Sequence, residues 1–387
     1  MSFSNLKKFG LLPRVIIAIA LGIGIGLVAP AGVVRAFVTF NGVFGNFIGF
    51  LIPLIIFGLV TPAIAGLGRN AGRMLLLAAV IAYGSSVCSG LLAWGTGVAV
   101  FPRLIDINAV RQLVDDYEAV KPYFTIDIPP LANVMSTLVL SFTVGLGMAA
   151  FDSKSLSRAM NEFRDIIASA IAVAMVPLLP LYIMGIFMEM ASSGQAWHVL
   201  SVFFTIISVI FILHIALLLA QYLVAGAIAR RNPLRALWTM LPAYVTALGT
   251  SSSAATIPVT LRCVKSNGVR DEVADFVVPL CATIHLSGSA MKITACATAL
   301  IIMQGTAIEP LTMVGFIMML GVMMVAAPGV PGGAIMAALG VLDTILGFTP
   351  DQQALMIALY ITMDSFGTAC NVTGDGAIAL VINRVSN

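Results

Sequence analysis

The chain has 387 residues, 60% hydrophobic and 10% charged, with a formal net charge of +3 and a mean hydropathy of +1.05. A soluble protein carries about 25% charged residues, so this composition excludes a soluble globular protein and predicts an all-α integral membrane protein. The small net charge gives no reason to expect a nucleic-acid partner. The five cysteines are scattered without a Cys-x-x-Cys pair, so we interpret them as packing residues and expect no metal cofactor there.

Eight apolar runs are long enough to cross a membrane of about 30 Å as helices. They lie at about 12–30, 37–66, 74–100, 131–151, 166–191, 199–228, 273–304 and 354–383. The first run follows two lysines but continues to Pro30, which predicts a span and not a cleaved signal peptide.

Two further apolar stretches, at about 233–262 and 307–347, are interrupted at their middle. The first carries TSSS at 250–253, and the second carries PGVPGG at 328–333. Each has two arms too short to cross alone, which predicts two re-entrant helical hairpins covered by protein or facing a water-filled cavity. The alternative is two ordinary spans.

The basic residues give this layout an orientation. If the N-terminus is cytoplasmic, 15 of the 20 lysines and arginines fall on the cytoplasmic side, four fall outside, and only Lys292 lies within a span. This distribution obeys the positive-inside rule and predicts a multi-pass protein of the inner or plasma membrane with both termini in the cytoplasm. It also gives the two hairpins opposite orientations, which is typical of a secondary transporter with its site at the midplane.

A polar stripe runs along the final apolar stretch. Asp364, Thr368, Asn371 and Asp375 are spaced by 4, 3 and 4 residues, so on one helix they fall within an arc of about 60°. An Asp at the bilayer centre costs roughly 2.5–3.5 kcal/mol to insert. A membrane helix that keeps two such acids on one face is expected to bind something there.

Four motifs in this region resemble the dicarboxylate/amino acid:cation symporter family, which has the glutamate-transporter-like fold. They are TSSSAATIP at 250–258, CATIHLSGSA at 281–290, GVPGGA at 329–334 and DSFGTACNVTGD at 364–375. The resemblance implies eight transmembrane helices plus two inverted hairpins and a homotrimer in membrane lipid. It also implies scaffold helices at 1–66 and 131–191, and a moving transport unit formed by helix 74–100 and residues 199–387.

The resemblance also implies roles for individual residues. Asp364 would take a solute's α-ammonium group. Asn371 would bind the α-carboxylate and help to shape a sodium site, and Asp375 would be a direct sodium ligand. The other substrate-binding positions it suggests are Ser251, Ser252, Ser253, Ser289, Val330, Gly333, Gly367 and Thr368, and the other cation-binding positions are Thr283 and His285. The alternative for Thr368 and Asn371 is a bond to neighbouring helices, and for the serines it is close helix approach.

Position 367 departs from the family's acid-selective members, which carry an arginine where this chain has Gly367. Without a guanidinium, a side-chain carboxylate would be buried unpaired, so we expect a neutral amino acid as solute. Gly367 also predicts free volume for a side chain larger than that of serine. Lys292 leaves an alternative open, because it could replace the arginine and admit an acidic amino acid or a C4-dicarboxylate. It could equally pair with Asp364 or Asp375, or snorkel to the interface.

A second departure concerns the coupling ion. The family motif Asn-Met-Asp-Gly-Thr reads His285-Leu286-Ser287-Gly288-Ser289 here, so an anionic sodium ligand is missing. Imidazole carries protons near neutral pH, and His285 is therefore a candidate for proton coupling. It could instead bond a helix break or touch the solute. We expect Na⁺ and/or H⁺-coupled symport by an elevator mechanism. The rivals are an uncoupled uniporter or channel, a membrane enzyme and a receptor, although no span carries a catalytic motif.

Overall fold

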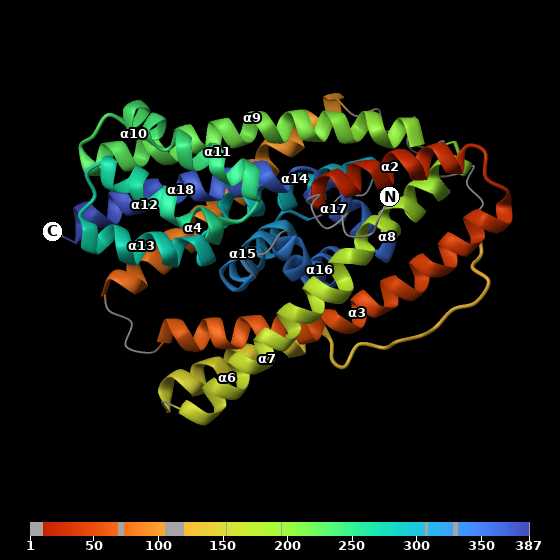
Figure 1. Cartoon of the computed structure of the whole chain (residues 1–387), viewed down its shortest axis with the longest axis horizontal. Coiled ribbons are helices and arrows are strands. Elements are labelled where there is room, and N and C mark those ends of the chain that lie inside the picture. The colour runs from red at the N-terminus through yellow and green to blue at the C-terminus, as the bar shows by residue number, and fades with distance from the viewer. Residues whose placement is uncertain are drawn as a thin grey trace, which may run out of the picture.

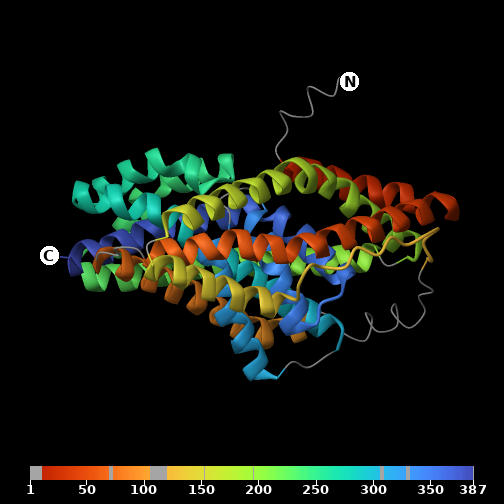
Figure 2. The same ribbon diagram turned by 90° about the horizontal axis from the view of Figure 1, so that it is seen from below.

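The computed structural model describes residues 11–68, 73–104, 120–151, 153–194, 196–305, 309–327 and 332–386, and this described part of the chain is helical without strands. The predicted substrate-binding residue Val330 lies outside the described residues. Figure 1 shows α9 along one long edge of the molecule and α3 along the opposite edge, with α14 to α18 between them. Figures 1 and 2 both place α12, α13 and the C-terminus at the same end.

Five helical segments of the described chain are long and apolar enough to cross a membrane. They are Ala31–Gly66, Met74–Leu104, Lys154–Ser192, Leu200–Ala229 and Asp271–Met303. These segments coincide with five of the eight predicted runs, and the shorter apolar helices Pro13–Gly26 and Ser136–Ala150 coincide with two more. The structure thus has the long apolar helices of a multi-pass membrane protein, whereas the number of spans stays a prediction.

The helices of the first half pack mainly on one another. Here α2 (Leu11–Gly26) lies along α8 (Val176–Ser192), and α3 (Ala31–Gly68) packs against α6 (Val134–Ala150) and α7 (Lys154–Ala170). A five-residue π-helical turn, Ile171–Met175, joins α7 to α8. On α2, a Cβ at Gly22 or Gly26 would collide with carbonyl oxygens of α8, so these glycines permit the close approach typical of membrane helices.

The helices of the second half surround the last helix. The last helix, α18 (Asp364–Val385), packs against four others: α9 (Ala196–Ala229), α11 (Leu241–Thr250), α13 (Asp271–Ile284) and α14 (Ser287–Met303). In addition, α14 packs along α4 (Arg73–Leu104). This arrangement encloses α18 on several sides. The division into scaffold and transport units remains a prediction.

Both interrupted stretches form pairs of packed helices. The first pair is α11, preceded by the short α10 (Pro233–Thr239), and α12 (Ser253–Ser266); the second is α15 (Pro310–Ala326) and α16 (Gly333–Leu346). Each of these helices has 17 residues or fewer, which is less than the about 20 needed to cross. Their placement in a membrane as re-entrant hairpins stays a prediction.

The turn from α12 to α13 carries exposed charge. Lys265 Nζ lies 2.9 Å from Asp275 Oδ1 and 3.4 Å from Asp271 Oδ1. The hydrogen bond that Lys265 donates to Asp275 is the main cause that raises the pKa of Lys265. Asp271 also stands in the first turn of α13, where its carboxylate complements the helix dipole.

The last two predicted spans are broken helices. Run 354–383 was expected as one helix, but it consists of α17 (Pro350–Thr362) and α18, which are bent by 63° relative to each other. This prediction of continuity was wrong because Met363 leaves the helical conformation, with φ −111° and ψ 12°. The seventh run breaks at His285, which ends α13 with φ −108° and ψ 97°. Both breaks lie beside the candidate site.

Candidate functional site

The polar stripe predicted for the last stretch lies wholly within α18, despite the break before it. Asp364, Thr368, Asn371 and Asp375 are each 8% exposed or less. Asp364 opens the helix, and the other three residues follow along its buried face. Buried acids are costly unless they are paired, and each of these two carboxylates has a basic side chain beside it.

A small cavity lies between the first helix pair and the helices α13, α14, α16, α17 and α18. Its volume of about 20 Å³ holds roughly one water molecule. The residues that line it are Ser251, Ser253, Ala282, Thr283, Leu286, Ser289, Ala334, Tyr360, Asp364, Thr368 and Asn371. Seven of these were predicted as solute or cation contacts from the sequence. Ser252, Gly333 and Gly367 are not part of its lining.

Asp364 is paired with Lys292, a side chain of α14 that is fully buried. Lys292 Nζ lies 3.5 Å from Asp364 Oδ1, donates to the Met363 carbonyl oxygen at 3.2 Å, and lies 3.7 Å from the centre of the Tyr360 ring. Asp364 Oδ2 accepts the backbone N–H of Gly332 at 2.9 Å. Of the open alternatives for Lys292, the structure therefore shows the pair with Asp364.

The space beside Gly367 is filled by another side chain, so the expectation of free volume there was wrong. A Cβ built on Gly367 would lie 2.5 Å from both Cε and Nζ of Lys292. The lysine thus occupies the space where a side chain at position 367 would begin. Gly367 is required by Lys292 and leaves no room there for a larger solute.

Asn371 holds the start of α14. Its Oδ1 accepts the backbone N–H of Gly288 at 2.8 Å and of Ser289 at 3.4 Å, and its Nδ2 donates to Ser289 Oγ at 3.2 Å. Ser289 Oγ also lies 2.9 Å from the Tyr360 hydroxyl. These are the N–H groups that a helix leaves unpaired at its N-terminus. In this structure Asn371 bonds a neighbouring helix, which is the alternative given for this residue in the sequence analysis. A solute would have to compete for these hydrogen bonds.

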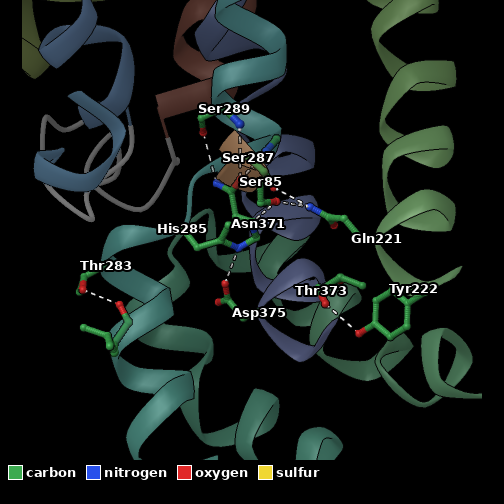
Figure 3. A network of polar contacts seen from close by, with 12 residues as sticks. Ser85, Gln221, Tyr222, Thr283, His285, Ser287, Ser289, Asn371, Thr373 and Asp375 are labelled. Carbon is green, nitrogen blue, oxygen red and sulfur yellow. Dashed lines mark hydrogen bonds and ion pairs between the residues drawn. The ribbon is translucent and has the colours of Figure 1, made fainter. Parts of the chain in front are cut away.

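Asp375 is paired with His285 at the end of α13. His285 Nδ1 lies 2.8 Å from Asp375 Oδ1, and the two side chains are 0% and 1% exposed. His285 Nε2 lies 3.0 Å from Ser85 Oγ on α4. Gln221 Nε2 donates to Ser85 Oγ at 3.0 Å and to Ser287 Oγ at 3.1 Å. Figure 3 shows Asn371 between Ser289 and the pair of His285 and Asp375.

The remaining predicted side chains bond to other atoms of the protein. Ser251, at the end of α11, has a left-handed φ of 50°, and its Oγ lies 2.7 Å from Ser365 Oγ. Ser252 caps α12 by accepting from Ala255 N. Thr283 and Thr368 donate to carbonyl oxygens of their own helices, which is the ordinary behaviour of a helical threonine.

Several site residues were missed by the sequence analysis. Tyr360 lies one turn before Asp364, whereas Ser85 and Gln221 stand inside the third and sixth apolar runs. A glutamine in the middle of a membrane span is a signal that could have been used. Gly332 contributes a backbone N–H group, and a backbone group cannot be predicted from the type of the residue.

The fold and the site together define a class: a polytopic helical membrane protein with a paired, buried charge cluster between interrupted helices. A family model, the sodium:dicarboxylate symporter family, matches residues 11–385. The chain belongs to this family, and its members are transporters, not enzymes.

Curated relatives agree with this family. Serine/threonine transporter SstT of Acinetobacter baumannii is 26% identical over 389 residues, covering 95% of each chain. Excitatory amino acid transporter 1 of Rattus norvegicus is 27% identical over 289 residues, which is 72% of this chain and 52% of that protein. Excitatory amino acid transporter 4 of Mus musculus is 28% identical over 72% of this chain and 51% of its own length. The chain thus spans about half the length of these excitatory amino acid transporters.

Proposed function

We propose that this protein is a secondary active transporter that couples the entry of Na⁺, H⁺ or both to the symport of a small neutral amino acid. The observation that carries the proposal is the pair of buried acids, Asp364 and Asp375, on one face of α18. Asp364 borders a cavity that is also lined by Ser251 and by residues of α12, α13, α14, α16 and α17. The resemblance to SstT, whose name gives serine and threonine as solutes, supports a small neutral solute.

The cation is proposed to act at Asp375. A hard cation prefers oxygen ligands, and one oxygen of this carboxylate already faces His285 at 2.8 Å. A sodium ion would therefore displace the imidazole from that oxygen, whereas a proton would be shared within the pair. Ser287 supplies a hydroxyl where the family has a carboxylate, which supports a smaller set of sodium ligands than is usual.

Coupling follows from shared contacts. Asn371 bonds the first turn of α14, and Ser287 in that same turn is bonded by Gln221 and Ser89. Gln221 also reaches Ser85 and so His285. Solute and cation would each bias the position of this one turn, and two ligands that favour the same state bind cooperatively. An elevator movement within a homotrimer of the inner membrane completes the proposal.

A second candidate is an acidic amino acid or C4-dicarboxylate as solute, with Lys292 in the role of the missing arginine. Lys292 Nζ occupies the space where a side chain at position 367 would begin, and this favours an acidic solute. However, its contacts all lie within the protein, and it is not among the residues lining the cavity. The neutral solute is therefore preferred.

Uptake into liposomes tests both points. Purified protein is reconstituted, and uptake of labelled serine is followed under an inward Na⁺ gradient, an inward H⁺ gradient, both, or neither. The proposal expects accumulation above the outside concentration with at least one gradient. Uptake that stops at equal concentrations would identify a uniporter. Serine, alanine, glutamate and aspartate are then compared as competitors, and the strongest competition by glutamate or aspartate would contradict a neutral solute.

A further inference from the structure

Both carboxylate oxygens of Asp364 are already engaged in the structure. Oδ1 lies 3.5 Å from the ammonium of Lys292, and Oδ2 accepts the Gly332 N–H at 2.9 Å. This is the carboxylate that the family resemblance assigns to a solute's α-ammonium. Here the protein supplies an ammonium of its own.

Lys292 is not among the residues that line the cavity. Its other two contacts are the Met363 carbonyl oxygen, at the C-terminal end of α17, and the face of the Tyr360 ring. A cation is stabilised in both places, by the helix dipole and by the ring. Gly367 is the residue that leaves space for it. The lysine is therefore a built-in counter-charge.

We propose that Lys292 replaces the solute's α-ammonium as the partner of Asp364, so that the site also accepts small monocarboxylates without an α-amino group, such as 2-hydroxy acids. This inference rests on the proposed function and concerns only which solutes the same site takes. An incoming ammonium would be attracted by Asp364 and repelled by Lys292, so it would gain less than it would beside an unpaired carboxylate.

The cavity would have to enlarge to hold a solute, and its lining offers hydroxyl groups beside one carboxylate. Asp364 is the charged residue among those that line it, and three residues with hydroxyl groups, Ser251, Ser289 and Thr368, line the same space. A hydroxyl can accept and donate where an ammonium only donates. A second carboxylate would find no unpaired cation among the described lining residues and would be costly to bury. The geometry thus points to monocarboxylates.

Alanine and lactate test this directly, because they differ only in the α-ammonium and the α-hydroxyl group. Each is measured as a competitor of labelled serine uptake and as a thermal stabiliser of the purified protein. The wild type is expected to bind the L-forms of both within about tenfold of each other, or about 1.4 kcal/mol. In Lys292→Met, which frees Asp364, the ratio should shift towards alanine by more than about tenfold.

Thr294→Val is the matched control. Thr294 lies on the same helix, is 0% exposed, and its Oγ1 has no hydrogen-bond partner, so this change should leave the alanine-to-lactate ratio at the wild-type value.

The inference is overturned if the wild type prefers alanine by more than about tenfold or if Lys292→Met leaves the ratio unchanged. If Lys292→Met fails to fold, the wild-type ratio decides alone. Accumulation of alanine with rejection of lactate would refute this inference and leave the transport proposal standing; accumulation of neither solute, nor of serine, would refute the transport proposal itself.

Discussion

The close contact between Gly367 and Lys292 predicts a large effect for the smallest possible substitution, Gly367→Ala. In an ordinary helix this change stabilises by roughly 1 kcal/mol. Here the new Cβ would lie 2.5 Å from Cε and Nζ of a fully buried lysine. Overpacking of this kind costs about 1–3 kcal/mol, and displacing Lys292 from a buried pair costs up to about 3–5 kcal/mol. We expect a net destabilisation of about 2 kcal/mol or more.

Thermal unfolding of the purified protein in detergent measures this effect, and a double-mutant cycle assigns its cause. In a Lys292→Ala background the clash is absent, so Gly367→Ala should be neutral or stabilising. Gly147→Ala is a control in α6, because a Cβ there meets nothing within 4 Å. The reasoning is refuted if Gly367→Ala is as stable as the wild type, or if its cost is the same with and without Lys292.

Three further predictions concern the charged pairs. Asp364→Asn should abolish uptake and also lower stability by about 3 kcal/mol or more, because Lys292 loses its buried partner; a fully stable variant would argue against that pair. His285→Asn should shift the ion preference towards Na⁺, and an unaltered pH profile of uptake would count against a proton role for this imidazole. Asp375→Asn should remove cation dependence or all activity, so unchanged stimulation by sodium would exclude Asp375 as the cation's ligand.

Periodicity and charge were enough to predict much of this protein. The spacing of Asp364 and Asp375 predicted their common face, because helical geometry depends only on local sequence. The breakers at 250–253 and 328–333 located the two interrupted stretches because serine, glycine and proline act on the backbone locally. The described helices end or begin at those positions.

The helix break at Met363 and the contacts between distant side chains could not be predicted from the sequence. No glycine or proline stands between Thr362 and Asp364, and the bend there is held by contacts from afar: Lys292 on the Met363 carbonyl oxygen and Gly332 on Asp364. Periodicity carries no information about partners more than 30 residues away. For the same reason Gly367 was interpreted as empty space, whereas a lysine from another helix fills it.

We propose that a solute binds at the cavity between the interrupted helices, beside Asp364. A cryo-electron microscopy structure of the protein with bound solute tests it most directly. The account predicts density within hydrogen-bonding distance of Asp364 or Asn371, in an enlarged form of the present 20 Å³ space. Larger cavities lie elsewhere, for example the space of about 430 Å³ lined by Trp238, Leu219 and Phe366. Solute density there, with the Asp364 region unchanged, would contradict the account.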